Sequence, residues 1–310
     1  MPHAAVNGQR IWYQDSGGPG LPLVLAHGFL MDSAMFDPQV EALAGEHRVI
    51  TWDQRGHGRT ESTPDAFSYW DSADDQRALL DHLGIQRAVV GGMSQGGFIG
   101  LRFALRYPER TAGLVLIDTQ SGLEDPEKVP EYDMMLDVWA ADGPSLPLRE
   151  MVAAIIIGNQ RPESAPYLEK WESLELHRLQ QIYRTLMDRD DITGRLGEIA
   201  APAVVIHGEE DVAIPLARAE ELCAGLSGCR QVVRIAGAGH AVGYASASQF
   251  TREYCRAFGA PPSQDAILSV RNPADGVTVS VSSAATGTSL ALILATPCYH
   301  PAPGEHPADS

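Results

Sequence analysis

Cysteine is scarce in this chain of 310 residues, which contains only four of them. Cys223, Cys229, Cys255 and Cys298 do not show the paired spacing of a metal site, and all lie far in sequence from the serine motif described below. The sequence therefore predicts no metal centre built from cysteines. Reduced structural thiols are the expected state of these four side chains.

Basic residues are also few, and long apolar runs are missing. The 40 acidic residues outnumber the 23 Lys and Arg, and the formal charge of −17 disfavours nucleic acid and anionic membranes as partners because like charges repel. No stretch approaches the ~20 apolar residues that span a bilayer, and Met1 to Ala5 are not a basic segment followed by an apolar run. We expect a soluble, cytoplasmic protein. The sequence carries no signal of its oligomeric state.

What the sequence does contain is a regular alternation of short apolar runs and helical patterns. Its length allows one large domain, or a core with an inserted subdomain. Strands that alternate with helices require parallel crossovers, so an α/β fold with a mainly parallel sheet follows. The expected strands are 3–6, 9–15, 21–26, 48–52, 88–91, 113–117, 203–206 and 231–235, and the expected helices include 33–43, 70–83, 214–226 and 248–258.

One glycine-bracketed serine stands where an apolar run meets a helical pattern. The run 88–91 is followed by Gly92-x-Ser94-x-Gly96 and then by apolar residues at helical spacing. This pattern is typical of a nucleophile elbow, where the strand turns so sharply into a helix that small neighbours are a steric requirement. Ser94 is therefore the predicted nucleophile of an acyl transfer. The alternative is an ordinary glycine turn between a strand and a helix.

The loop after the run 21–26 is a second place at which backbone amides can serve chemistry. An elbow serine needs two hydrogen-bond donors for the developing oxyanion, and the N–H groups of Phe29 and Gln95 are the candidates. His27 is expected to support this loop without touching substrate.

A glycine-rich loop with two fixed charges runs from Asp53 to Thr60. Bracing of the loop by Asp53 and Arg55 is the expected role of these charges, although the loop could also hold a ligand. His57 lies in the same turn, which we expect to be solvated, and this argues against a role as catalytic base.

From residue 121 to residue 195 the alternation stops, and the segment is helical and punctuated by proline. We expect a lid inserted between two strands of the sheet, where it would cover the serine. Met134, Met135 and Trp139 are candidates for the lining of an apolar substrate pocket. Packing within the lid is the simpler explanation for any one of them.

The last residues, 260–310, differ in composition from the predicted core, which comprises 1–120 and 196–259. They begin and end with proline and are rich in Ser, Thr, Ala and Val between. We expect a poorly ordered or peripheral extension. The run 278–282 alternates like a strand, so an edge strand is the alternative.

Two further residues complete a catalytic set after later strands. His240 lies in a glycine-rich loop after the run 231–235, where it is constrained yet mobile enough to approach a serine, and Asp211 follows the run 203–206. The order Ser94, Asp211, His240, each after a strand, resembles the α/β-hydrolase superfamily. The resemblance covers about residues 3 to 259 and includes His27-Gly28, the loop from Asp53 to Thr60, the elbow, His207-Gly208-x-x-Asp211 with Pro215, and Gly239-His240.

The acid of this set has an alternative. Asp118 also ends a strand near the serine, and some members of the superfamily place the acid there. Asp211 lies in the better motif and is the preferred assignment. Glu209 and Glu210, its neighbours, are expected to be loop residues that do not reach His240.

The resemblance implies an eight-stranded, mostly parallel sheet with helices on both faces, the triad at its C-terminal edge and a lid after the sixth strand. Ser94 would attack a carbonyl, His240 would carry the proton, and Asp211 would orient the imidazole, with no metal or organic cofactor. A serine nucleophile argues against the alkyl-enzyme chemistry of dehalogenases and epoxide hydrolases, which use an aspartate.

Within the superfamily, the chain resembles the small-molecule branch of carboxylesterases, enol-lactonases and cofactor-free haloperoxidase-like perhydrolases. Hydrolysis of an apolar ester or lactone through an acyl-enzyme is therefore the first hypothesis. The alternatives are carbon–carbon bond hydrolysis of a diketone, acyl transfer to an acceptor other than water, and ligand binding without turnover. The sequence does not distinguish among the substrates of these reactions.

Overall fold

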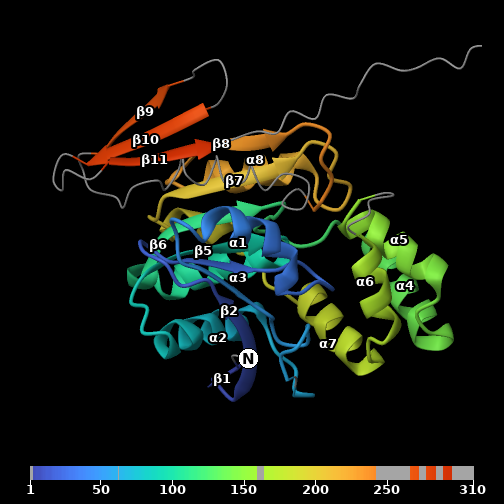
Figure 1. The fold of residues 1–310 in the computed structure, drawn as a ribbon. Coiled ribbons are helices and arrows are strands. Elements are labelled where there is room, and N and C mark those ends of the chain that lie inside the picture. Colours follow the sequence, from blue (N-terminus) through green and yellow to red (C-terminus); the bar gives the residue numbers. More distant parts are fainter. Residues whose placement is uncertain are drawn as a thin grey trace, which may run out of the picture. The chain divides into compact units, whose positions relative to one another are not determined.

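The structure, a computed structural model, describes residues 3–61, 63–158 and 164–241 together with three strands between residues 266 and 294. The chain divides into two compact units, Met1–Ala257 and Phe258–Ser310. The first unit contains an eight-stranded sheet with flanking helices, and the second contains a three-stranded sheet (Figure 1). The predicted α/β fold with an eight-stranded, mostly parallel sheet is confirmed.

The strands of the large sheet lie close to the predicted bounds: β1 (His3–Val6), β2 (Gln9–Asp15), β3 (Leu23–Ala26), β4 (Val49–Trp52), β5 (Ala88–Met93), β6 (Thr111–Ile117), β7 (Ala203–Gly208) and β8 (Cys229–Ile235). Their order is β1-β2-β4-β3-β5-β6-β7-β8. The hairpin β1–β2 joins β4 antiparallel, and all pairs from β4 to β8 are parallel. Every residue of β3 to β6 is buried, which explains why these strands read as continuous apolar runs.

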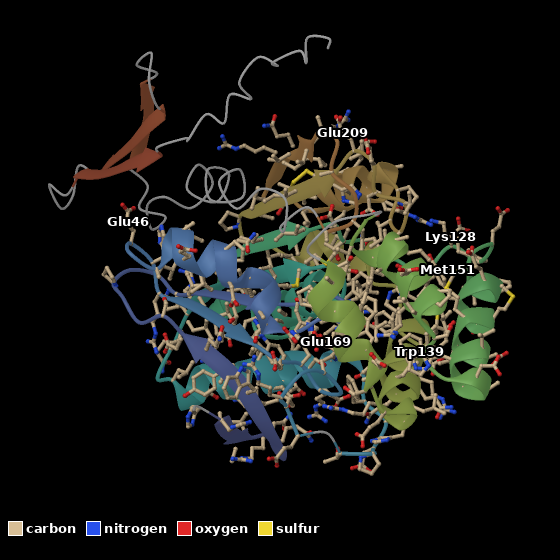
Figure 2. The ribbon with its side chains drawn as sticks, turned by 45° about the vertical axis from the view of Figure 1, so that its right-hand side comes forward. Glu46, Lys128, Trp139, Met151, Glu169 and Glu209 are labelled. Carbon is tan, nitrogen blue, oxygen red and sulfur yellow. A yellow bond between two sulfur atoms is a disulfide. The ribbon has the colours of Figure 1, made fainter. Side chains whose placement is uncertain are left out.

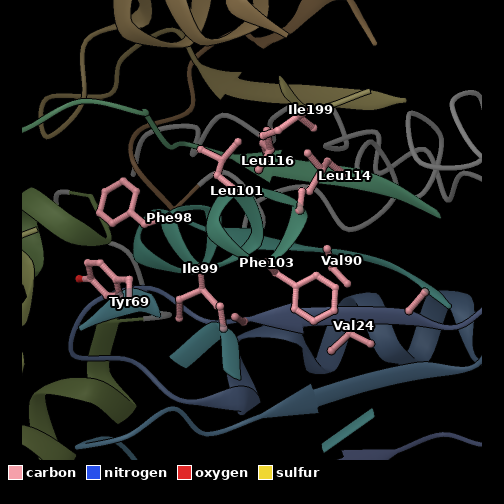
Figure 3. Close-up of a cluster of buried hydrophobic side chains, with 14 of the residues drawn as sticks. Val24, Tyr69, Val90, Phe98, Ile99, Leu101, Phe103, Leu114, Leu116 and Ile199 are labelled. Carbon is pink, nitrogen blue, oxygen red and sulfur yellow. The ribbon is translucent and has the colours of Figure 1, made fainter. Parts of the chain in front are cut away.

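The described helices that accompany this sheet are α1 (Asp37–Leu43), α2 (Tyr69–His82), α3 (Gln95–Arg106) and α8 (Leu216–Gly225). The predicted helix 33–43 is a 3-10 turn at Ser33–Phe36 that continues into α1. Helix α3 packs on β3, β5 and β6, and α2 packs on α3. Figure 3 shows the resulting core, in which Leu101 of α3 lies beside Leu116 of β6 and Phe98 of α3 lies beside Tyr69 of α2. The serine motif is thus at the centre of the fold.

Between β6 and β7, the described part of the chain forms the helices α4 (Val129–Asp142), α5 (Leu146–Ile156), α6 (Ala165–Glu172) and α7 (Leu176–Met187). They gather at one side of the large sheet (Figure 1). Three of the six prolines in this segment, Pro130, Pro147 and Pro166, stand in the first turns of α4, α5 and α6. Proline is well tolerated there because the first N–H groups of a helix have no partner within the helix. We call α4–α7 the lid.

The second unit is described through its strands alone. β9 (Ala266–Arg271), β10 (Val277–Ser283) and β11 (Ser289–Leu294) form an antiparallel sheet in the order β11-β10-β9. The expected strand 278–282 lies within β10, and it pairs with β9 and β11, so it is not an edge strand of the large sheet. The predicted helix 248–258 lies outside the described residues. None of the described helices has both the length and the apolar character that a membrane crossing requires.

Cys223 and Cys229 form a disulfide, so the expectation of reduced thiols is wrong for this pair. Cys223 lies in the last turn of α8 and Cys229 begins β8, and their Cα atoms are 5.3 Å apart. The six-residue separation carries no signal of its own; the tight turn from α8 into β8 brings the two thiols together. Cys255 and Cys298 lie outside the described residues.

Candidate active site

Ser94 stands at the apex of the turn from β5 into α3. Its φ of 52° and ψ of −116° lie in a region that residues with a side chain rarely adopt, and its N–H donates to the Ile117 carbonyl at 2.8 Å. Gly92 and Gly96 are required on either side, because a Cβ at each would lie 1.9 Å from the Ala26 carbonyl oxygen of β3. The predicted strand, sharp turn and helix around the serine are therefore present.

The loop after β3 begins with a fully buried histidine. His27 Nδ1 lies 2.8 Å from the Gly28 carbonyl oxygen, and its Nε2 lies 3.0 Å from the backbone N of Gln54. Since an N–H can only donate to a nitrogen that lacks a proton, Nε2 accepts and Nδ1 donates, and the imidazole is neutral. Burial lowers the pKa of His27, which agrees with this state. His27 supports the loop that presents Phe29, as predicted.

The loop from Asp53 to Thr60 is braced by its charges. The carboxylate of Asp53 accepts from the N–H groups of Ser33 and Arg59, each at 2.8 Å. Arg55 forms an ion pair with Asp75 of α2. His57 is buried rather than solvated, and its Nδ1 lies 2.8 Å from the Arg55 carbonyl oxygen. Burial lowers the pKa of His57 well below its ordinary value, so it is a neutral part of this loop.

His240, in the loop after β8, contacts Asp211, in the loop after β7. His240 Nδ1 lies 2.8 Å from Asp211 Oδ2, while Asp211 Oδ1 accepts from the N–H groups of Ala213 and Ile214 at 2.9 Å each. Burial by itself would raise the pKa of Asp211, but the contact with His240 and the N–H donors outweigh burial and lower it. An ionised carboxylate against Nδ1 fixes the imidazole tautomer and leaves Nε2 as the basic nitrogen.

Asp118 and His207 lie behind this pair. Asp118 Oδ1 accepts from the N–H of Gly208 at 2.8 Å, and His207 Nε2 lies 2.9 Å from the Ile214 carbonyl oxygen. Among the described residues, Asp118, His207 and Asp211 are the one group whose ligand atoms are close enough together to hold a metal ion, all within 4.8 Å. The hydrogen bonds to Gly208, Ile214 and His240 already occupy atoms of all three side chains.

A cavity of about 100 Å³ lies between the elbow and the lid. Ser94, His240 and Phe29 line it from the sheet side, and apolar residues of α4, α5 and α7 line it from the lid side. Met135 and Trp139 belong to this lining, and Figure 2 shows Trp139 within the lid. The prediction that Met134 lines the pocket is wrong, because this residue is 59% exposed and is absent from the lining. Met135 and Trp139 lie about one helical turn apart and share a face of α4. Met134, one position earlier, is rotated by about 100° around the helix axis from Met135 and lies on a different face.

Polar groups are rare in this cavity. Glu124 lines it and forms an ion pair with Arg189 at 3.0 Å, with side chains that are 12% and 2% exposed. Tyr132 also lines it, and burial, followed by the nearby carboxylates of Glu124 and Glu131, raises its pKa to about 12. The tyrosine is therefore a neutral hydroxyl.

Known proteins are similar to this chain in sequence and in fold. A family profile described as alpha/beta hydrolase fold matches residues 22–159. The structure of the enol-lactonase from Burkholderia xenovorans LB400 is 27% identical with a TM-score of 0.75, covering 84% of this chain and all of that one. The chain belongs to the α/β-hydrolase superfamily. A thermophilic esterase from Thermogutta terrifontis is 29% identical with a TM-score of 0.72, covering 82% of this chain and 96% of its own. RutD of Rhizobium rhizogenes, a protein named for carbamate hydrolysis, is 29% identical over 240 residues, 76% of this chain and 91% of its own.

In this α/β hydrolase, the residues predicted from the sequence lie around one cavity or contact a residue that does. Ser94, Phe29 and His240 line one cavity, and Asp211 holds His240. Glu209 and Glu210 are exposed loop residues, as predicted, and Figure 2 shows Glu209 at the surface. Sequence reasoning missed Glu124, which follows β6 in a segment with no recognisable pattern, and it missed the buried partners of the elbow described below.

Proposed function

We propose that this protein hydrolyses small-molecule carboxylic esters or lactones through an acyl-enzyme. One observation carries the proposal: a strained serine and a histidine held by a buried aspartate line the same largely apolar cavity. The names of relatives point to the same class. Besides the esterase and the enol-lactonase, they include Est816, described as degrading N-acyl homoserine lactones, at 27% identity and a TM-score of 0.70.

The first half of the reaction forms the acyl-enzyme. Ser94 Oγ attacks the substrate carbonyl carbon while His240 Nε2 takes its proton, and the N–H groups of Phe29 and Gln95 stabilise the resulting oxyanion. The carbon–oxygen bond to the leaving group then breaks, and His240 gives that oxygen the proton. Asp211 stabilises the imidazolium between these two transfers.

The second half regenerates the enzyme. A water molecule gives a proton to His240 and attacks the acyl carbon, and the tetrahedral intermediate collapses as the proton returns to Ser94. The products are a carboxylic acid and an alcohol, which remain one molecule when the substrate is a lactone.

The cavity favours an apolar acyl chain or ring. Residues such as Leu179, Ile155 and Met187 offer no hydrogen bond, and a carboxylate at Glu124 disfavours a second negative charge nearby. Because Arg189 neutralises much of that charge, Glu124 and Tyr132 are suited to accept a hydrogen bond from a neutral hydroxyl or amide group of the substrate.

A substrate panel with a serine control tests this function. We expect turnover of p-nitrophenyl esters or lactones by the native protein, labelling by a fluorophosphonate, and loss of both in Ser94→Ala. Carbamates, diketones and alcohol acceptors belong in the panel because they separate ester hydrolysis from amide-type hydrolysis, carbon–carbon cleavage and acyl transfer. A native protein that neither turns over any ester nor reacts with the fluorophosphonate would contradict the proposal and favour a ligand-binding role.

A further inference from the structure

The peptide group between Ser94 and Gln95 is a rigid plane that carries an N–H on one side and a carbonyl on the other. Its N–H belongs to Gln95 and is the proposed oxyanion donor, and its carbonyl belongs to Ser94. Because the peptide is trans and planar, the direction of the carbonyl fixes the opposite direction of the N–H. Groups that bind the Ser94 carbonyl therefore determine where the oxyanion donor points.

Three donors meet at the Ser94 carbonyl oxygen. The N–H groups of Gly97 and Phe98, from the first turn of α3, approach it at 2.8 and 3.3 Å. The third donor is a side chain, the hydroxyl of Thr119, at 2.8 Å. Hydrogen bonds from these two amides are ordinary at the start of a helix. Thr119, in contrast, comes from a different part of the chain, two residues after the end of β6.

Thr119 is fixed in place by its surroundings. It is fully buried, and it contacts α3 so closely that a Cβ at Gly97 would lie 2.4 Å from its hydroxyl oxygen. The hydroxyl therefore has little freedom to turn to another acceptor. A buried hydroxyl that donates to a peptide carbonyl also polarises that peptide and increases the positive charge on its N–H.

The side chain of Gln95 is itself held by hydrogen bonds to other buried side chains. Its Oε1 accepts from the Tyr69 hydroxyl at 3.2 Å, and its Nε2 donates to Gln54 Oε1 at 2.8 Å. Gln54 in turn donates from Nε2 to the His27 carbonyl oxygen at 2.6 Å. All four residues are buried, so water does not compete with these bonds.

The oxyanion loop shows the same arrangement. The peptide that carries the Phe29 N–H has the Gly28 carbonyl at its other end, and this carbonyl accepts from His27 Nδ1 at 2.8 Å and from the Met31 N–H at 3.2 Å. Each proposed oxyanion amide thus has a buried side chain donating to the carbonyl of its own peptide: His27 for one and Thr119 for the other.

We propose that Thr119 is a positioning residue for the reaction, and that its hydroxyl holds the Ser94–Gln95 peptide so that the Gln95 N–H meets the oxyanion. This inference rests on the proposed esterase or lactonase function. Thr119 touches neither substrate nor the reacting atoms. Its contribution is to the transition state, where charge develops on the carbonyl oxygen, and much less to the binding of the neutral ester.

Thr119→Val is the decisive variant, because it removes the hydroxyl and keeps the shape. Thr111 is the matched control: it is equally buried at the other end of β6, and its hydroxyl donates to the Tyr107 carbonyl at 3.0 Å, at the far end of α3. Both substitutions delete one threonine-to-carbonyl hydrogen bond. We expect Thr119→Val to lower kcat about tenfold with little change in KM, a fraction of the loss caused by removing a whole oxyanion donor.

Two further measurements separate positioning from simple destabilisation. A trifluoromethyl ketone, which forms a tetrahedral adduct with the serine, should bind Thr119→Val more weakly by the same factor as kcat/KM falls. Thr111→Val should lower the melting temperature to a similar extent and leave kcat within about twofold of native. Thr119→Ser, which keeps the hydroxyl, should recover most of the rate.

The inference is overturned if Thr119→Val and Thr111→Val have the same kcat, or if Thr119→Ser is as slow as Thr119→Val. Should the valine variant fail to fold, Thr119→Ala removes the hydroxyl without adding bulk and makes the same comparison. The proposed function is tested separately by turnover in the native protein. If the native protein reacts with a fluorophosphonate but turns over no ester, the labelling rates of the variants replace kcat, because the phosphonyl oxygen occupies the same oxyanion site.

Discussion

Asp118 and Asp211 follow neighbouring strands, and their hydrogen-bond partners indicate which of them is the acid that orients His240. Asp211 accepts from His240 and from two backbone N–H groups, whereas Asp118 accepts from the N–H of Gly208. We predict that Asp211→Asn lowers kcat by about 10³–10⁴-fold, since the amide no longer selects the right tautomer of His240 or stabilises the imidazolium. Asp118→Asn keeps an oxygen for Gly208 and should change kcat by less than about tenfold.

Steady-state kinetics of the two variants with one ester, after circular dichroism confirms that both are folded, make the comparison. If Asp118→Asn alone loses orders of magnitude, the acid of the triad is Asp118 and the contact with Asp211 is structural.

At the same scale, single residues show where sequence reasoning succeeds and fails. Glycine spacing predicts the strained turn at Ser94, and the motifs after two strands predict loops that bring Asp211 and His240 into contact. Met134 was misjudged because residue type does not reveal which face of α4 is buried. Thr119 and Gln54 have no local signal at all, since their partners lie 25 and 41 residues away.

Elements were easier to predict than contacts. Continuous apolar runs gave the parallel strands, because these are buried on both faces, and glycine or proline marked the helix ends. The lid was expected as helical, but the bounds of its described helices were not, because proline is usually taken as a break although three of the six prolines stand in first turns here. The disulfide between α8 and β8 could not be predicted, since it depends on the angle between a helix and the next strand.

That disulfide joins two elements that lie next to the loops of two proposed triad residues. α8 follows the loop of Asp211, and β8 precedes the loop of His240. We predict that Cys223→Ser combined with Cys229→Ser lowers the free energy of unfolding by about 2 kcal/mol, a modest loss because the closed loop is short. Turnover at 25 °C should be nearly unchanged, since Asp211 is fixed by backbone N–H groups.

Thermal unfolding with and without dithiothreitol measures the effect of this disulfide. Reductant should lower the melting temperature of the native protein and leave the double variant unaffected. Equal melting temperatures for the native protein in both conditions would show that the disulfide does not stabilise it.

For the whole molecule, the division of the chain predicts which part is needed for turnover. The lining of the cavity lies between residues 29 and 240, within the first unit. The enol-lactonase structure matches over its entire length while covering 84% of this chain. The fold of that enzyme is therefore complete without a counterpart of the other 16% of this chain. A chain that ends at Gly259 should therefore keep kcat and KM within about twofold of the full protein. A large loss of kcat would mean that residues 260–310 contribute to the site.

Buried histidines predict how the whole molecule responds to acid. Burial lowers the pKa values of His27, His57 and His207 below 6.5, the ordinary value. Between 6.5 and each lowered pKa, the unfolded chain binds a proton that the folded chain does not, so stability falls as pH falls. Each histidine should contribute a slope of up to about 1.4 kcal/mol per pH unit, and the three together up to about 4 kcal/mol per pH unit.

Urea unfolding at pH values between 7.5 and 5 measures this slope, and His57→Asn is the variant that tests its origin. The asparagine does not titrate, so the variant should lose stability at pH 7.5 through the broken contacts of His57, yet show a slope smaller than native by up to about 1.4 kcal/mol per pH unit. The two curves should therefore approach each other as the pH falls. Parallel curves would show that His57 binds its proton equally well in the folded and unfolded chains, and that its burial does not make the protein sensitive to acid.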